Sequence, residues 1–162
     1  MTYKLDDYST NLNSDVFLID SATGVTAGNT WNVTKKTGKT YNTSVTLNAS
    51  NNLVLPSGSS YYLMASPVAR QASMNGLIVF QFYDETNSAY VGSAGQLNFS
   101  GSFNSTNLQG QKSARAFIES GDITGANIEV SFKIVSTSGS TFQISSTLFS
   151  YTGYPSLTVL EV

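Results

Sequence analysis

The residue types that carry most protein chemistry are scarce in this sequence. The chain has 162 residues and contains neither histidine nor cysteine. A Ser-His-Asp or Cys-His nucleophile is therefore excluded, and so is a zinc site with nitrogen or sulfur ligands. Acidic residues are adjacent only at Asp6-Asp7 and Asp84-Glu85. Glycoside hydrolysis needs two carboxyl groups facing one cleft, and nothing here pairs the scattered acids, so we expect neither an enzyme nor a cofactor.

Three short segments remain as candidates for binding. Residues 84–88, DETNS, could hold calcium through several loop oxygens, but Asp and Asn between two strands favour a β-turn. Lys35, Lys36 and Lys39 form a basic cluster, which we interpret as a solvated hairpin tip, with contact to an acidic partner as the alternative. Trp31 could stack on a sugar, although a core or edge position is favoured.

Composition and charge limit the possible partners. Hydrophobic residues make up 40% of the chain and aromatic residues 12%, which is enough for a core. Charged residues make up only 11%, against about 25% in typical soluble proteins. A net charge of −2 argues against a nucleic-acid partner, which requires a basic face. The start, MTYKLDDYST, lacks the pattern of a signal peptide, and no stretch is long and apolar enough for membrane insertion.

The elements that must position any site are short strands. Runs rich in Val, Ile, Phe, Tyr and Thr alternate with Gly, Ser, Asn and Thr clusters, and no helical period is present. Many short strands in one domain predict an antiparallel sandwich or barrel. We expect strands at 16–20, 30–35, 43–47, 52–55, 61–67, 76–84, 89–92, 95–100, 113–119, 126–136, 141–147 and 156–162.

Two of these strands are apolar on both faces. Most alternate, as in 128–134, where Ile128, Val130, Phe132 and Ile134 share one face. The segments YYLMA (61–65) and GLIVFQFYD (76–84) do not. Only one face of each sheet of a sandwich belongs to the core, so the second face needs a cover. A folded-over loop is one possibility, but a subunit contact is favoured because two strands share the feature.

The same region carries a resemblance to a known family. LPSGSSYYLMASPVAR (55–70) resembles a recurring segment of bacteriophage virion proteins, in which a Leu-Pro-x-Gly turn leads into a Tyr-rich strand. In the following segment 76–95, Tyr83, Val91 and Gly92 stand in corresponding places. SARAFIESG (113–121) and YPSLTVLEV (154–162) resemble later strands of the family. With the segments that precede residue 55, the resemblance spans residues 22 to 162. The chain departs from the pattern in an extra Ser before Tyr61 and in a longer loop over 98–111.

The resemblance implies a fold and an assembly. The family is an all-β, antiparallel jelly-roll sandwich of the tumour-necrosis-factor-like type, usually a homotrimer. It implies a single jelly-roll domain over 16–162 after an N-terminal arm over 1–15. The resemblance implies that five residues contribute either to the core or to the trimer contact, and the sequence does not show which of the two each residue joins: Tyr62, Met64, Phe80, Phe82 and Tyr83. The arm is either a frayed terminus or an anchor on another virion protein, with four anchoring residues: Tyr3, Leu5, Tyr8 and Leu12.

Two functions follow as hypotheses. The first is a capsid decoration (cement) protein, assembled in the host cytoplasm, that binds the major capsid protein or another virion protein on the outside of the phage head. The sequence contains no shaft repeats and no coiled-coil heptads, and this favours a decoration protein over a free-standing tail fibre. The alternative is the receptor-binding tip of a tail or head fibre, with loops 100–112 and 136–141 recognising a host surface glycan.

Overall fold

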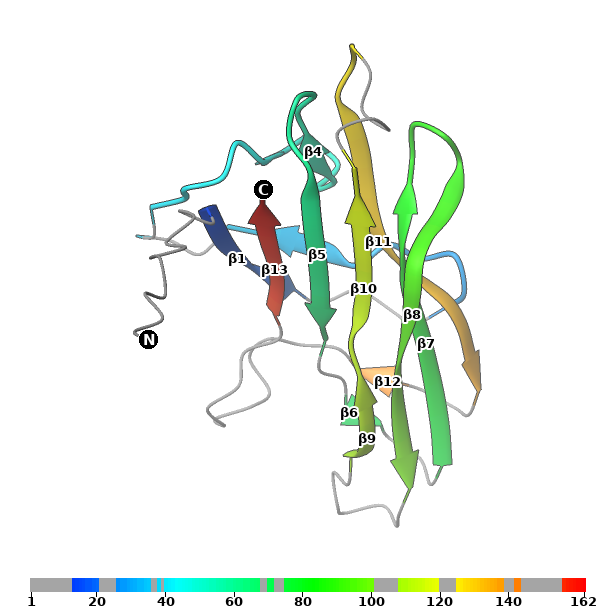
Figure 1. The fold of residues 1–162 in the computed structure, drawn as a ribbon. Helices are drawn as coiled ribbons and strands as arrows, with labels where there is room; N and C mark the ends of the chain where they lie inside the picture. The colour runs from blue at the N-terminus through cyan, green and yellow to red at the C-terminus, as the bar shows by residue number, and fades with distance from the viewer. Residues whose placement is uncertain are drawn as a thin grey trace, which may run out of the picture.

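The computed structural model describes residues 13–20, 26–35, 38, 40–67, 70–71, 75–100, 108–119, 125–138, 142–143 and 156–162. The described residues form strands, turns and bends (Figure 1). No helix in this part of the chain is long and apolar enough to cross a membrane. The strands are β1 (Asn13–Asp20), β2 (Asn32–Thr34), β3 (Thr46–Leu47), β4 (Leu53–Leu55), β5 (Tyr61–Ser66), β6 (Arg70–Gln71), β7 (Asn75–Asp84), β8 (Ala89–Ser100), β9 (Leu108–Lys112), β10 (Ala114–Ile118), β11 (Ile128–Ser138), β12 (Phe142–Gln143) and β13 (Ser156–Glu161).

The strands form two antiparallel sheets that meet along one seam. Sheet A has the order β2-β1-β13-β5-β10, and sheet B has the order β8-β7-β11-β4-β3, with β9 also beside β8. A single residue pair, Arg115 with Ser93, joins β10 to β8 and makes the two sheets one continuous ladder. The strands β6 and β12 form a separate small ribbon (Figure 1). The expected all-β, antiparallel architecture is therefore confirmed.

The opposite side is closed by the segment that leads into β2. The backbone N–H of Trp31 donates to the carbonyl of Phe132 over 2.8 Å, and the N–H of Gly28 donates to the carbonyl of Ile134 over 2.8 Å. A few residues later the same chain pairs with β1 as strand β2. One continuous segment thus contacts sheet B first and sheet A next, so that the ladder nearly closes into a barrel.

Two glycines allow the close approach of β8 to β10 at the seam. A Cβ atom at Gly92, whose φ is +73°, would lie 2.0 Å from the carbonyl oxygen of Arg115. A Cβ atom at Gly95 would lie 2.1 Å from the Phe80 ring and 2.5 Å from the carbonyl oxygen of Lys112. No other residue type fits these positions without movement of backbone atoms.

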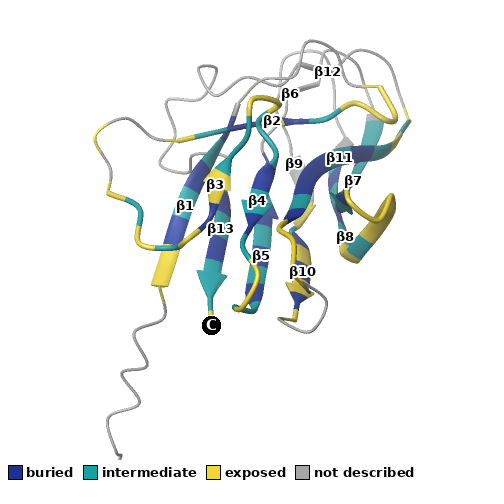
Figure 2. Cartoon of the chain, turned by 90° about the horizontal axis from the view of Figure 1, so that it is seen from above, coloured by how far each residue is buried: buried dark blue, intermediate teal, exposed yellow. Residues whose placement is uncertain are grey.

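The core lies between the sheets and is formed by alternate residues of the strands. Figure 2 shows buried and exposed bands alternating along β10, whose inward residues are Ala114, Ala116 and Ile118. At the centre, Trp31 is fully buried, with its ring centroid 5.7 Å from that of Phe132. The core position favoured for Trp31 is therefore confirmed. Its Nε1 atom is buried and has no hydrogen-bond partner among the described residues.

Most expected strands are present, with three corrections. The predicted break at 93–94 is wrong, because β8 runs unbroken from Ala89 to Ser100 and accommodates Gly92 within the strand. The predicted loop over 100–112 is wrong in its last part, where Leu108–Lys112 forms β9 along β8. The loop expected at 136–141 also begins later, because β11 extends to Ser138.

Candidate functional site

The two apolar faces of the segment 61–65 point to different places. Tyr61, Leu63 and Ala65 of β5 are completely buried and belong to the core. Tyr62 and Met64 alternate with them and are half-buried on the outer side of sheet A. The second apolar face of this strand therefore lies on the surface of the described chain.

Neighbouring strands extend this outer face into a continuous surface. Tyr62 is paired with Phe117 of β10 on one side and with Leu160 of β13 on the other. In the next row, Met64 is paired with Arg115 and Thr158. We name the outer surface of sheet A "face A" and define it by eight residues: Val16, Leu18, Tyr62, Met64, Arg115, Phe117, Thr158 and Leu160.

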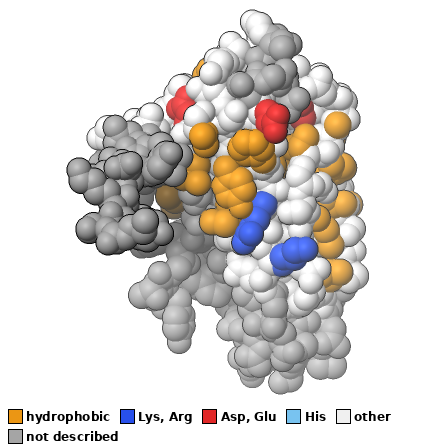
Figure 3. Space-filling view, in the orientation of Figure 1, with side chains coloured by type: hydrophobic (Ala, Val, Ile, Leu, Met, Phe, Trp, Pro, Cys, Tyr) orange, Lys and Arg blue, Asp and Glu red, His pale blue; other side chains and the backbone are white. Residues whose placement is uncertain are grey.

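Face A is mainly apolar. Phe117, on the edge strand β10 of sheet A, is 55% exposed, which is unusual for a phenylalanine. Figure 3 shows hydrophobic side chains gathered over β13, β5 and β10, with basic side chains beside them on the same face. A contiguous exposed apolar surface of this kind is typical of an interaction site.

Two carboxylates of sheet A bind the segment 42–44 through hydrogen bonds. Asp15 of β1 is buried and accepts hydrogen bonds from the backbone N–H groups of Asn42 and Thr43 at 2.8 and 2.7 Å. Glu161 of β13 accepts from both the backbone N–H and the hydroxyl of Ser44 at 2.6 Å. Burial alone would raise the pKa of Glu161, but these hydrogen bonds outweigh it and hold the pKa below its ordinary value.

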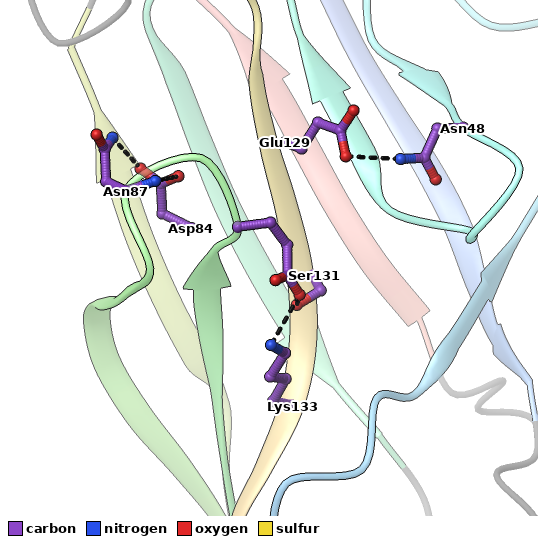
Figure 4. Close-up of polar contacts among 7 residues, drawn as sticks. Asn48, Asp84, Asn87, Glu129, Ser131 and Lys133 are labelled. Carbon is purple, nitrogen blue, oxygen red and sulfur yellow. Dashed lines mark hydrogen bonds and ion pairs between the residues drawn. The ribbon is translucent and has the colours of Figure 1, made fainter.

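The outer surface of sheet B carries the half-buried apolar side chains of Leu77 and Val79 and, beside them, a polar region that we name "face B". We define it by Gln81, Tyr83, Tyr90, Glu129, Ser131 and Lys133. The Lys133 ammonium lies 3.5 Å from the centroid of the Tyr83 ring and 2.8 Å from a carboxylate oxygen of Glu85. Burial acts to raise the pKa of Glu85, but its bonds to Lys133 and Ser131 dominate and lower it. Figure 4 shows the polar contacts of Ser131 and Lys133 and the bond from Asn48 to Glu129, which is 2.8 Å long.

The five residues predicted for the core or a subunit contact lie in three places. Tyr62 and Met64 are on face A, half-buried. Phe80 and Phe82 are completely buried in the core and pack on the Phe132 ring, each with a centroid distance of 5.3 Å. Tyr83 lies on face B. The structure thus brings only two of the five together on one surface.

Two major members of face A, Phe117 and Leu160, were missed as candidates. Both belong to expected strands, and alternation was the available signal. Phe117 is the apolar residue on the face of ARAFIE opposite to Ala114, Ala116 and Ile118. The four residues predicted to anchor an arm, Tyr3, Leu5, Tyr8 and Leu12, lie outside the described residues, and the predicted arm shares Asn13 to Asp15 with β1.

The acidic segment 84–88 is a turn, as favoured from the sequence. The two carboxylate oxygens of Asp84 accept hydrogen bonds from the backbone and the side chain of Asn87, at 2.9 and 2.7 Å (Figure 4). Ser88 completes the turn with a φ of +55°. In the part of the chain that the structure describes, no three potential metal-ligating side chains from His, Cys, Asp and Glu gather at one place.

Comparison with known proteins adds no relative. No protein-family model matches the chain, and no curated protein matches its sequence.

Proposed function

We propose that this chain is a structural protein of a bacteriophage virion, a jelly-roll protein that forms a homotrimer and decorates the outside of the capsid. The observation that carries the proposal is the apolar row on face A, in which Phe117 is 55% exposed. Phe117, Tyr62 and Leu160 form this row across three strands, whereas face B carries an ion pair and a polar network. The resemblance of segment 55–70 to phage virion proteins is the reason for assigning this surface to a virion protein.

The strand order supports the jelly-roll description. If β1, β4, β5, β7, β8, β10, β11 and β13 are numbered one to eight along the chain, sheet A has the order 1-8-3-6 and sheet B the order 5-4-7-2. Most consecutive strands of this set cross between the sheets, and the first strand pairs with the last. This order is that of an eight-stranded jelly roll made of two Greek keys.

Face A supports a closed assembly of copies. In a cyclic trimer, each copy presents the same surface around one axis, and the buried centre of such a contact is apolar and rich in aromatic residues. Tyr62, Met64, Phe117 and Leu160 have these properties. A trimer built on face A would leave face B and its polar network turned toward solvent or toward the shell.

Binding to the assembled shell would supply the function. A protein that binds neighbouring capsid subunits in the closed lattice, but not separated subunits, stabilises the lattice by mass action. A trimer can contact several capsid subunits at once, which raises its avidity. No catalytic step is needed for this role.

The experiment has two parts. Sedimentation equilibrium should give a mass of three 17.3 kDa chains at micromolar concentration. The purified protein should then bind DNA-free heads of the phage that encodes it and raise their resistance to heat. A stable monomer would contradict the trimer. A few dozen copies or fewer per virion, with binding to host cells instead of heads, would contradict decoration and favour a receptor-binding tip.

A further inference from the structure

A small basic pocket opens at the seam between the two sheets. Its volume is about 360 Å³, and the described residues that line it are Ser93 of β8, Gln111 and Lys112 of β9, Ser113, and Arg115 of β10. All of them are polar, two are cationic, and none is a carboxylate. This part of the lining is suited to a small anionic group.

The two cations of this pocket lack an acidic partner. Within the described residues, the ion pair that is present joins Lys133 to Glu85 on the other sheet. Lys112 and Arg115 make no ion pair there, and they line the same pocket although like charges repel each other. An anion between them would relieve this repulsion. The guanidinium group of Arg115 can also donate two parallel hydrogen bonds to one oxyanion.

The walls of the pocket are held in place before any ligand binds. The Gln111 side chain donates from Nε2 to the carbonyl oxygen of Pro67 over 3.0 Å, and the Ser113 hydroxyl lies 2.7 Å from that of Ser66. Across the pocket, Gly92 and Gly95 fix the close approach of β8 to β10. The Ser93 hydroxyl makes only a long contact of 3.5 Å, with the carbonyl oxygen of Arg115, so it can turn to donate to a ligand.

We propose that this pocket binds an oxyanion, either a phosphate or a carboxylate group, between Lys112 and Arg115. The ligand could be a free ion or the acidic side chain of another protein chain. The site is built from residues of one chain and does not depend on the virion proposal. Arg115 also belongs to face A, where it is paired with Met64 of β5, so a carboxylate bound here would lie at the edge of that face.

The test follows the backbone amide signals of the ¹⁵N-labelled full chain by NMR. Sodium phosphate, sodium acetate and a short Glu-rich peptide are titrated separately, with sodium chloride replacing each at constant ionic strength. We expect saturable shifts at Ser93 and at 111–115 that chloride does not produce. Arg115→Gln and Lys112→Gln should each weaken binding at least ~10-fold. The control, Lys35→Gln, removes the same charge from an exposed lysine outside this pocket and should bind like the wild type.

The titrations distinguish the two sources of the anion. Tighter binding of phosphate supports a free-ion site, and tighter binding of the Glu-rich peptide supports a protein-borne carboxylate. Arg115→Lys keeps the charge but loses the guanidinium fork, so an affinity between those of the wild type and Arg115→Gln supports the assigned geometry. If none of the three ligands gives saturable shifts in the wild type, or if both Gln variants bind like the wild type, the proposal is overturned.

Discussion

Face A and face B both carry aromatic side chains toward solvent, but these side chains differ in their contacts within the chain. On face B, Tyr83 is overlaid by the Lys133 ammonium at 3.5 Å and contacts the Tyr90 ring at a centroid distance of 5.0 Å, while Tyr90 itself is 45% exposed. On face A, Phe117 is 55% exposed beside Tyr62 and Leu160. The Tyr83 ring is thus capped by a charged side chain of its own chain, whereas the apolar row that contains Phe117 is typical of an interaction surface.

The largest expected effect comes from placing a charge at the most exposed apolar residue of face A. Phe117→Asp puts a carboxylate into each of three proposed subunit contacts. At about 2 kcal/mol per contact, the trimer should be weaker by about 6 kcal/mol, and the variant should sediment as a single chain at micromolar concentration. The control is Tyr90→Asp, because Tyr90 of face B is 45% exposed. Equal masses for the two variants would remove the distinction between the faces.

The seam that joins the two sheets should be the next most sensitive place. In Gly95→Ala, the added Cβ atom meets the Phe80 ring and the backbone of Lys112, so we expect a loss of about 3 kcal/mol in the free energy of unfolding. Gly58→Ala is the control, because Gly58 has a φ of +95° but nothing within 4 Å of an added Cβ atom. It should cost about 1 kcal/mol. Urea unfolding followed by Trp31 fluorescence measures both, and equal losses would show that the contacts at the seam do not matter.

A smaller effect is expected when the cap of face B is removed. Lys133→Ala uncovers the Tyr83 ring and breaks the ion pair with Glu85. The free energy of unfolding should fall by about 1 kcal/mol, since both contacts are partly exposed. The sedimenting mass should stay the same as that of the wild type. A variant that loses its oligomeric state instead would show that face B takes part in assembly.

The smallest effect should appear only in the dependence of stability on pH. The pKa of Glu161 is lowered in the folded chain, so its hydrogen bonds stabilise the fold above pH 4.5, its ordinary value, and this contribution is lost as the pH falls through the folded-state pKa. Glu161→Gln should therefore flatten the acid side of the stability profile by at most one proton's slope. Thermal unfolding between pH 2.5 and 6 measures the change. An unaltered slope would mean that Glu161 does not fasten the segment at Ser44.

Strand positions could be predicted from the sequence where alternation was clear. In β11, Ile128, Val130, Phe132 and Ile134 all point into the core, as their spacing indicated. Strand β9 could not be predicted, because residues such as Gln and Gly in its sequence LQGQK have little preference for strands. Its pairing with β8, which lies before it in the chain, makes it a strand.

The composition of face A could be predicted only in part. In YYLMA both possible registers bury apolar side chains, so periodicity could not decide between Tyr61 and Tyr62. The pairing of β5 with β13 and β10 settles it, because Tyr62 stands between Leu160 and Phe117. Such cross-strand neighbours are far apart in sequence. The same reason explains why the closure of the ladder by residues 28–34 was not foreseen.

The position of β13 has a consequence for how the protein is made. This strand, Ser156–Glu161, lies between β1 and β5 and pairs with both of them. During synthesis β1 and β5 leave the ribosome long before β13 does, so for most of that time sheet A has a gap at its centre. Face A is therefore incomplete until residues 156–161 have been synthesised, and no contact that needs the whole face can form before then.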